Sequence, residues 1–222
     1  MRPILLFLAL SGAGIITWLI LARPDKKTEA PKQAALVVSK HSDSFNRAIS
    51  TLLGDYEKLS ELFVAWDSVA VSPAAQTMLQ NVNGMNMEDL KKDSSAIYET
   101  AVAFIENIKG DLQTIASEKG IRPQRETFNN MTDNLYQLLN TVKYDREKLY
   151  LQQCPMAFDD VQSASWLSRE NKIRNPYLGL KDPRYGKGML SCGENIKVLN
   201  EDLPDNKTDK EGSEEQTQKN TK

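Results

Sequence analysis

Between residues 45 and 142, apolar residues recur at alternating steps of three and four. This spacing places side chains on one face of an α-helix and is typical of helices packed along their length against other helices. The first set is Phe45, Ile49, Leu52, Tyr56, Leu59, Phe63 and Trp66. We expect a helix here that Ser42 or Asp43 caps and that ends near Asp67, before a turn at Ser72-Pro73.

The same spacing returns in two later stretches. Asn86 or Asp89 is expected to open one helix, and Pro123 suits the first turn of the next. The apolar positions are Ile97, Ala101, Phe104, Ile108, Leu112 and Ile115, then Phe128, Met131, Leu135, Leu138 and Val142. Together with a short helix over 74–82, three long amphipathic helices predict a mainly α protein built as an antiparallel helical bundle.

The chain begins with an uncharged apolar run over residues 4–22. These 19 residues would span ~28 Å as a helix, enough to cross the hydrocarbon core of a bilayer. A cleaved signal peptide is the alternative, although such peptides have a shorter apolar region and a clear small-residue cleavage site. We expect residues 1–22 to be a transmembrane signal anchor that directs the chain outward, followed by a tether over 23–40.

Composition argues against several functions. The 30 acidic residues nearly match the 28 basic ones, so we expect no nucleic-acid partner, which would call for a basic face. The single histidine, His41, argues against a histidine-based metal site or triad, and we expect it to be exposed near a helix cap. Because no acid and base stand at a recognisable spacing, we expect no enzymatic activity. Residues 201–222 are polar and charged and are expected to form a disordered tail.

Beyond Val142 the helical period fades into a glycine-rich segment that holds both cysteines. Two short strands are expected to pair there, over 150–154 and 193–199, with a turn at Asn175-Pro176-Tyr177 between them. Trp166 is expected to join Pro176 and Tyr177 in a small core beneath the cysteines. We therefore expect one domain over 41–200, a helical bundle that ends in a small loop-rich module.

Each cysteine has a methionine two or three residues away. Thiolate and thioether sulfur atoms are soft ligands that select Cu(I) or Ag(I) over hard cations. Cys154 and Met156 would face the same side of an extended segment, and Met189 and Cys192 would share one face of a helical turn. The four sulfur atoms could therefore converge on one metal ion.

A disulfide between Cys154 and Cys192 is the competing interpretation. Disulfides are natural in an oxidising envelope compartment. Closing a loop of this length would stabilise the module by roughly 4 kcal/mol in the chain-entropy model. The residue types leave both interpretations open, but the lack of a Cys-x-x-Cys pair argues against a thioredoxin-like activity.

The motifs of this module form a set. They are Cys154-Pro155-Met156-Ala157, Trp166-Leu167-Ser168, Ile173, Asn175-Pro176-Tyr177 with Gly179, Met189-Leu190 and Cys192-Gly193, preceded by Gln124-Arg125-Glu126, Phe128 and Leu135-Tyr136. Together they resemble the bacterial family termed domain of unknown function 3347, over about residues 45–198. Residues 180–187 form an insertion relative to that pattern.

The resemblance implies an exported protein of the bacterial cell envelope. Members of the family occur alone or appended to periplasmic adaptor subunits of heavy-metal efflux systems, and the resemblance implies copper as the metal. We therefore expect a domain anchored in the inner membrane and facing the periplasm, with metal-efflux or other envelope proteins as partners. It would bind Cu(I) for capture or delivery through Cys154, Met156, Met189 and Cys192. The alternative is a non-catalytic interaction domain whose disulfide staples the C-terminal module.

Overall fold

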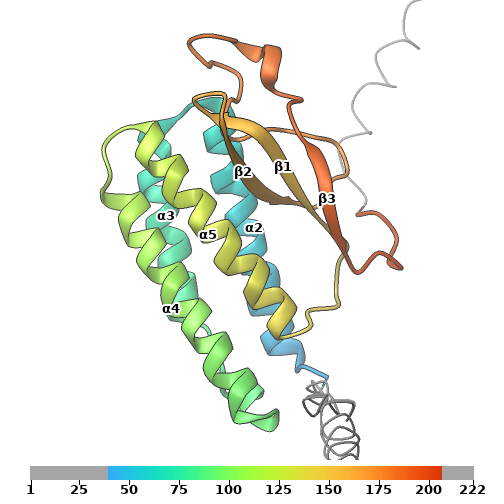
Figure 1. Cartoon of the computed structure of the whole chain (residues 1–222). Helices are drawn as coiled ribbons and strands as arrows, with labels where there is room; N and C mark the ends of the chain where they lie inside the picture. The colour runs from blue at the N-terminus through green and yellow to red at the C-terminus, as the bar shows by residue number, and fades with distance from the viewer. Residues whose placement is uncertain (1–39, 207–222) are drawn as a thin grey trace, which may run out of the picture. The chain divides into compact units, whose positions relative to one another are not determined.

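The computed structural model describes residues 40–206, in which four α-helices precede a three-stranded sheet (Figure 1). The elements are α2 (Asp43–Ala65), α3 (Ser68–Asn83), η1 (Glu88–Lys92), α4 (Ser95–Ser117), α5 (Ile121–Thr141), β1 (Leu149–Phe158), β2 (Gln162–Ser168), η2 (Lys187–Met189) and β3 (Glu194–Leu199). Both η elements are 3₁₀ helices. The expected helical bundle with a small C-terminal module is confirmed.

The predicted signal anchor over 1–22 lies outside the described residues, as do 23–39 and 207–222. Within residues 40–206, no helix is both long enough and apolar enough to cross a bilayer. The anchor, the tether and the polar tail therefore stay predictions.

Small polar side chains start three of the four helices. The hydroxyl of Ser42 accepts a hydrogen bond of 3.3 Å from the backbone N–H of Phe45, and Asp67 and Ser94 act likewise for α3 and α4. Each bond satisfies one of the N–H groups that the first turn of a helix leaves free. At the other end of α2, Trp66 adopts a left-handed conformation with φ of 60°. The helix therefore ends close to the expected residue.

Consecutive helices are neighbours in the bundle, in the order α2, α3, α4 and α5 (Figure 1). The bundle closes where Phe128 of α5 stacks on Tyr56 of α2, with ring centroids 4.9 Å apart. Except for Trp66 and Phe104, which are half-buried, the apolar residues that the spacing singles out fill the core. Only one position of the α4 stripe shifts, because Ile105 is buried where Phe104 was expected.

Two local predictions between α2 and α4 are wrong. The chain does not turn at Ser72-Pro73, because α3 continues through Pro73. Pro73 has no backbone N–H to donate to the carbonyl of Val69, and its ring crowds that carbonyl, yet the helix continues through this position. The helix expected to open at Asn86 or Asp89 is instead the short η1, and α4 begins after Ser94.

His41 is not the exposed residue that the sequence predicts. Its side chain is 4% exposed, and its ring centroid lies 4.6 Å from that of Phe45. Its Nε2 atom lies 2.5 Å from the carbonyl oxygen of Val142, 101 residues further along the chain. The burial arises because the start of α2 lies beside the end of α5, a tertiary contact that no local pattern reveals.

In the sheet, β1 is the central strand, and β2 and β3 pair with it antiparallel on either side. The two expected strands correspond to β1 and β3. The sequence does not predict β2, because residues 164–167 are all buried and the alternation that marks a half-exposed strand is missing. Figure 1 shows the sheet beside α2 and α5.

A buried chain of hydrogen bonds joins the sheet to both of these helices. The backbone N–H of Leu167 donates to the Tyr56 hydroxyl at 3.0 Å, which lies 2.7 Å from the hydroxyl of Thr132. Thr132 in turn donates to the carbonyl of Phe128 at 2.9 Å, so the Tyr56 hydroxyl donates to Thr132. Burial raises the pKa of Tyr56, and the phenol therefore keeps its proton and its place in the chain at neutral pH.

Candidate functional site: a groove beside the disulfide-bonded module

A disulfide joins the two ends of the cysteine module. Cys154 lies on β1 and is fully buried, and Cys192 follows η2. Their Cα atoms are 5.6 Å apart across a sequence separation of 38 residues. The structure thus bears out the disulfide interpretation, and the chain-entropy model assigns a loop of this length about 4 kcal/mol.

Asn175 joins two backbone segments of the module, the turn at residues 175–178 and the segment that carries Cys192. Its side-chain N–H donates to the carbonyl of Cys192 at 3.0 Å, and its backbone N–H donates to the carbonyl of Leu190 at 2.8 Å. Its side-chain carbonyl accepts the backbone N–H groups of Tyr177 and Leu178, which shapes the expected turn. The asparagine of the Asn-Pro-Tyr motif therefore ties this turn to the segment that carries Cys192.

Trp166 and Tyr177 form the predicted core beneath the cysteines. Both rings are buried, with centroids 6.1 Å apart, and the Tyr177 hydroxyl donates to the carbonyl of Ser165. Gly193 is required beside them. A Cβ atom at Gly193 would lie 2.8 Å from the Trp166 ring, and the φ of 139° also disfavours any other residue.

The structure brings two of the four predicted metal ligands together. Cys154 and Cys192 are bonded to each other, and Met156 and Met189 are half-buried against the core. A sulfur atom in a disulfide is not a thiolate, so these cysteines could hold a soft metal ion only after reduction. From residue 40 to residue 206, no three His, Cys, Asp or Glu side chains are grouped as metal ligands. Copper binding stays a prediction for the reduced protein.

The insertion over 180–187 lies against the end of α2. The backbone N–H of Leu180 donates to the carbonyl of Val64 at 2.8 Å, and the Asp182 carboxylate accepts the backbone N–H groups of Arg184 and Tyr185. The insertion is therefore a folded loop attached to the helical body. It does not separate Cys192 from Cys154.

A groove of about 960 Å³ lies between α2 and the loop that follows β2. We call residues 169–174 the bridging loop. Apolar residues make up about half of the lining of the groove, the buried ones being Leu53, Tyr56, Leu149, Trp166 and Leu167, and the half-buried ones Leu62, Ala74, Ile173 and Leu190. A concave, mostly apolar surface with a few polar groups is typical of ligand sites in proteins.

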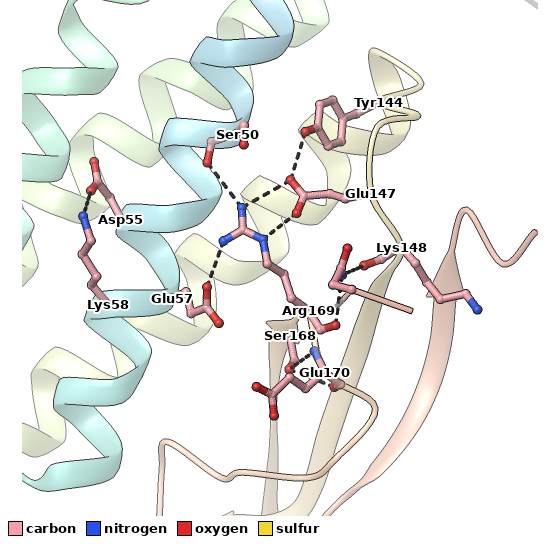
Figure 2. A network of polar contacts seen from close by, with 11 residues as sticks. Ser50, Asp55, Glu57, Lys58, Tyr144, Glu147, Lys148, Ser168, Arg169 and Glu170 are labelled. Carbon is pink, nitrogen blue, oxygen red and sulfur yellow. Dashed lines mark hydrogen bonds and ion pairs between the residues drawn. The ribbon is translucent and has the colours of Figure 1, made fainter. Parts of the chain in front are cut away.

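Arg169 fastens the first end of the bridging loop to α2. Figure 2 shows its guanidinium between Glu57 of α2 and Glu147, which precedes β1. The nitrogen–oxygen distances are 2.8 Å to Glu57 and 2.5 Å to Glu147, and the Tyr144 hydroxyl also donates to Glu147. Burial alone would lower the pKa of Arg169, but the two carboxylates outweigh it and the net shift is upward.

Arg174 fastens the other end. Its Nε and Nη2 atoms donate to the two carboxylate oxygens of Glu61 at 2.6 and 2.8 Å. Glu61 lies one helical turn after Glu57 on α2, so two ion pairs cross the groove side by side. Glu57 and Glu61 are 49% and 44% exposed, and ion pairs at such exposure contribute about 0.2–1 kcal/mol each.

Gln152 of β1 holds the backbone of the bridging loop from below. Its side-chain N–H group lies 3.0 Å from the carbonyl of Glu170 and 2.9 Å from the side-chain oxygen of Asn195 on β3. Gln152 is fully buried, so losing these bonds would leave polar groups unsatisfied. The bridging loop is therefore positioned by the sheet as well as by α2.

Two motif residues at the start of α5 support the ends of other helices. Arg125 is 3% exposed, stacks over the Trp66 ring at 4.2 Å and donates to the carbonyl of Phe63 at 2.6 Å. Burial lowers the pKa of Arg125 to about 9, with Asp182 opposing the shift. Gln124 donates to carbonyls at the end of α4. Both side chains satisfy helix ends, which accounts for this motif without a ligand.

The sequence does not predict the groove. Glu57, Glu61, Arg169 and Arg174 read as solvated charges on a helix face and in a loop. The four-residue spacing of the glutamates and the five-residue spacing of the arginines are the only local signals. Their pairing depends on β2 placing the loop beside α2, and β2 was itself not predicted.

Comparison with known proteins finds one family. The model of the family described as "Protein of unknown function (DUF3347)" matches residues 52–147. The match covers most of the helical body and ends before β1, so the motifs around Cys154 and Cys192 lie beyond it. No curated protein and no solved structure matches the chain. The resemblance that the sequence motifs predict is confirmed over the matched residues.

Proposed function

We propose from the geometry that this protein is a non-catalytic interaction domain. The groove between α2 and the bridging loop would bind an extended, aliphatic segment of a partner protein. The observation that carries the proposal is the apolar groove of about 960 Å³ beside a disulfide-bonded module.

The distance between the walls favours an extended segment over a helix. Side chains of Arg169 and Arg174 reach from one wall to hydrogen-bond glutamates of the other. A helix with side chains is about 10–12 Å wide, which is wider than one arginine side chain can bridge. From Leu53 to Leu62, α2 borders the groove for ~14 Å, the length of about four residues of extended chain.

An unpartnered hydrogen-bond donor favours a peptide over a plain acyl chain. Trp166 is among the residues that line the groove, its side chain is buried, and its Nε1–H has no partner among residues 40–206. A buried donor left unsatisfied costs about 1–3 kcal/mol. An extended peptide presents backbone carbonyls along its length, and one of them could accept this hydrogen bond.

The charges around the groove disfavour a highly charged ligand. Both signs occur along the rim, which carries Glu57, Lys58, Glu61, Arg169, Glu170, Lys172 and Arg174. Mixed charge gives little attraction for nucleic acid or for a densely anionic membrane surface. A rim of mixed charge suits an uncharged segment that is flanked by charged residues of either sign.

We place this interaction domain in the periplasm of a bacterial cell, anchored in the inner membrane by residues 1–22. The disulfide supports an oxidising compartment, because such bonds persist there and are rare in the cytosol. The partner would then be another envelope protein, and the subunits of a metal-efflux system are candidates from the family resemblance.

Selection of peptides tests the proposal. Nonapeptides displayed as a random library would be selected on the full, oxidised chain, and we expect enrichment of aliphatic residues at alternating positions. Ile173→Glu would place a charge in the groove and should weaken binding of an enriched peptide by about tenfold or more. Val69→Glu is the matched control, because Val69 is 84% exposed and lies outside the groove.

Two results would contradict the proposal. One is a selection that yields no aliphatic pattern. The other is a peptide whose affinity falls equally with Ile173→Glu and Val69→Glu. Binding of a fatty acid that Ile173→Glu abolishes, with no peptide bound, would instead assign the groove to an acyl chain.

A soft-metal site in the reduced protein is the second candidate function. It is favoured by the 5.6 Å separation of the Cys154 and Cys192 Cα atoms, which would leave two thiols side by side after reduction. Anaerobic titration of the reduced chain with Cu(I) against a chromophoric chelator tests it. Tight one-to-one binding that Cys154→Ser and Met189→Leu both weaken would support a site made of Cys154, Met156, Met189 and Cys192. Lack of competition by the reduced protein would refute it.

A further inference from the structure

We infer that the redox state of the Cys154–Cys192 pair controls the groove: the oxidised protein holds its partner and the reduced protein releases it. The inference rests on the proposed peptide-binding function and adds its regulation. It follows from the contacts that join the disulfide to the groove walls.

The first connection runs through Asn175. Its side chain donates to the carbonyl of Cys192, and its backbone N–H donates to the carbonyl of Leu190. Leu190 borders the groove, as does Arg174, the residue before Asn175. If reduction frees the backbone at Cys192, the positions of Leu190 and Arg174 would therefore loosen together.

The second connection runs through Trp166. Cys154 of β1 pairs with Ala164 of β2. Gln152, two residues before Cys154, pairs with Trp166, two residues after Ala164. The ring of Trp166 also lies directly against Gly193, the neighbour of Cys192. Trp166 borders the groove and carries the unpartnered Nε1–H, so movement at Cys192 would change the site where the peptide carbonyl is expected.

Few other contacts could hold the Arg174 end of the bridging loop after reduction. Between residues 169 and 193 the only regular element is η2, which has three residues. The ion pairs to Glu57 and Glu61 are half exposed, and exposed pairs are weak. The less exposed Arg169–Glu147 pair and the hydrogen bonds from Gln152 and Asn195 remain, but they fix only the first end and the middle of the loop.

The chemical step is thiol–disulfide exchange with a protein dithiol. Cys154 is fully buried and Cys192 is half-buried, so a thiolate of the dithiol would attack the Cys192 sulfur. This forms a mixed disulfide and releases Cys154 as a thiolate, which takes up a proton. The second thiolate of the reductant then attacks its own partner sulfur, which oxidises the dithiol and releases the Cys192 thiolate to be protonated.

Binding measurements in both redox states test the inference. The probe is a fluorescein-labelled nonapeptide of alternating valine and serine, titrated with the oxidised full chain and with the chain reduced by dithiothreitol. We expect affinity to fall by about tenfold or more on reduction, and to return on reoxidation. Asn175→Ala keeps the disulfide and the backbone bond to Leu190 but removes the side-chain bond to Cys192, so it should weaken binding by the oxidised protein.

Hydrogen exchange separates local loosening from unfolding. Reduction should remove protection from residues 169–174 and 190–199, whereas the amides of α4 should keep theirs. Equal affinity in both redox states would overturn the inference while leaving the proposed function standing. Loss of protection throughout α4 would also overturn it, because release would then reflect unfolding. A lack of binding by the oxidised chain to this probe and to every selected peptide would refute the proposed function itself.

Discussion

The helical body (residues 43–141) and the C-terminal module (residues 149–206) are stabilised in different ways. The body has one core of buried apolar residues that all four helices share. The sheet of the module shares this core through residues such as Phe158 and Trp166, but the loops that join its strands depend on one disulfide and on single buried polar side chains such as Asn175 and Gln152. Apolar burial is spread over many residues, whereas a polar network leaves unsatisfied groups when one member is lost.

This difference matters because the groove has one wall from each region. The α2 wall belongs to the core, so its position follows from the packing of the whole bundle. The wall made by the bridging loop depends on a few bonds, and each can be removed by one substitution. The two regions should therefore respond differently to mutation, and the following predictions test that expectation.

The largest effect is expected in the body, from Phe128→Ala. Phe128 is fully buried, with ring centroids 4.9 Å from those of both Tyr56 and Phe63. Removing a buried aromatic ring in this position should lower the free energy of unfolding by about 3–5 kcal/mol. Urea unfolding followed by far-UV circular dichroism measures it. Phe104→Ala at a half-buried position is the control and should cost clearly less. Equal losses in the free energy of unfolding for the two variants would show that burial of the ring does not determine the size of the loss.

Removing the disulfide should have the next largest effect. Cys154→Ala combined with Cys192→Ala is expected to lower the free energy of unfolding by about 2–4 kcal/mol. Unlike the loss from Phe128→Ala, this loss should be local. In hydrogen exchange, β3 should lose protection while α4 keeps it, and chemical reduction of the unmodified chain should give the same pattern. Equal loss in α4 would mean that the module and the body unfold as one unit.

The sequence predicts the body far better than the module, and the reason is physical. Helix periodicity is a local property, so the stripe from Phe45 to Phe63 identifies α2 and its buried face. Strand pairing joins distant segments, and β2 is covered on both faces, so no alternation identifies it. The groove depends on that strand, and the burial of His41 depends on a contact 101 residues away. The disulfide was open to prediction only because the chain has two cysteines.

Tyr56→Phe tests the connection between the two regions. The substitution removes the hydroxyl that accepts from Leu167 of β2 and donates to Thr132 of α5. It leaves a buried N–H without a partner, so we expect a loss of about 1–3 kcal/mol in the free energy of unfolding. The control is Tyr136→Phe, because the Tyr136 hydroxyl has no hydrogen-bond partner within residues 40–206. If both variants lose the same amount, the hydrogen-bond chain contributes nothing to joining sheet and bundle.

The smallest effects should come from the ion pairs that cross the groove. A double-mutant cycle with Glu61→Gln and Arg174→Gln is expected to give a coupling energy of about 0.2–1 kcal/mol that falls as salt is raised. The matching cycle with Glu147→Gln and Arg169→Gln should give a larger coupling that salt screens less. The side chains of Glu147 and Arg169 are 13% and 21% exposed, against 44% and 43% for Glu61 and Arg174. With this order, the bridging loop opens at its Arg174 end, next to Asn175 and the disulfide. If the Glu61–Arg174 coupling is the stronger one, the loop would open at its Arg169 end instead and would pivot about the end next to Cys192.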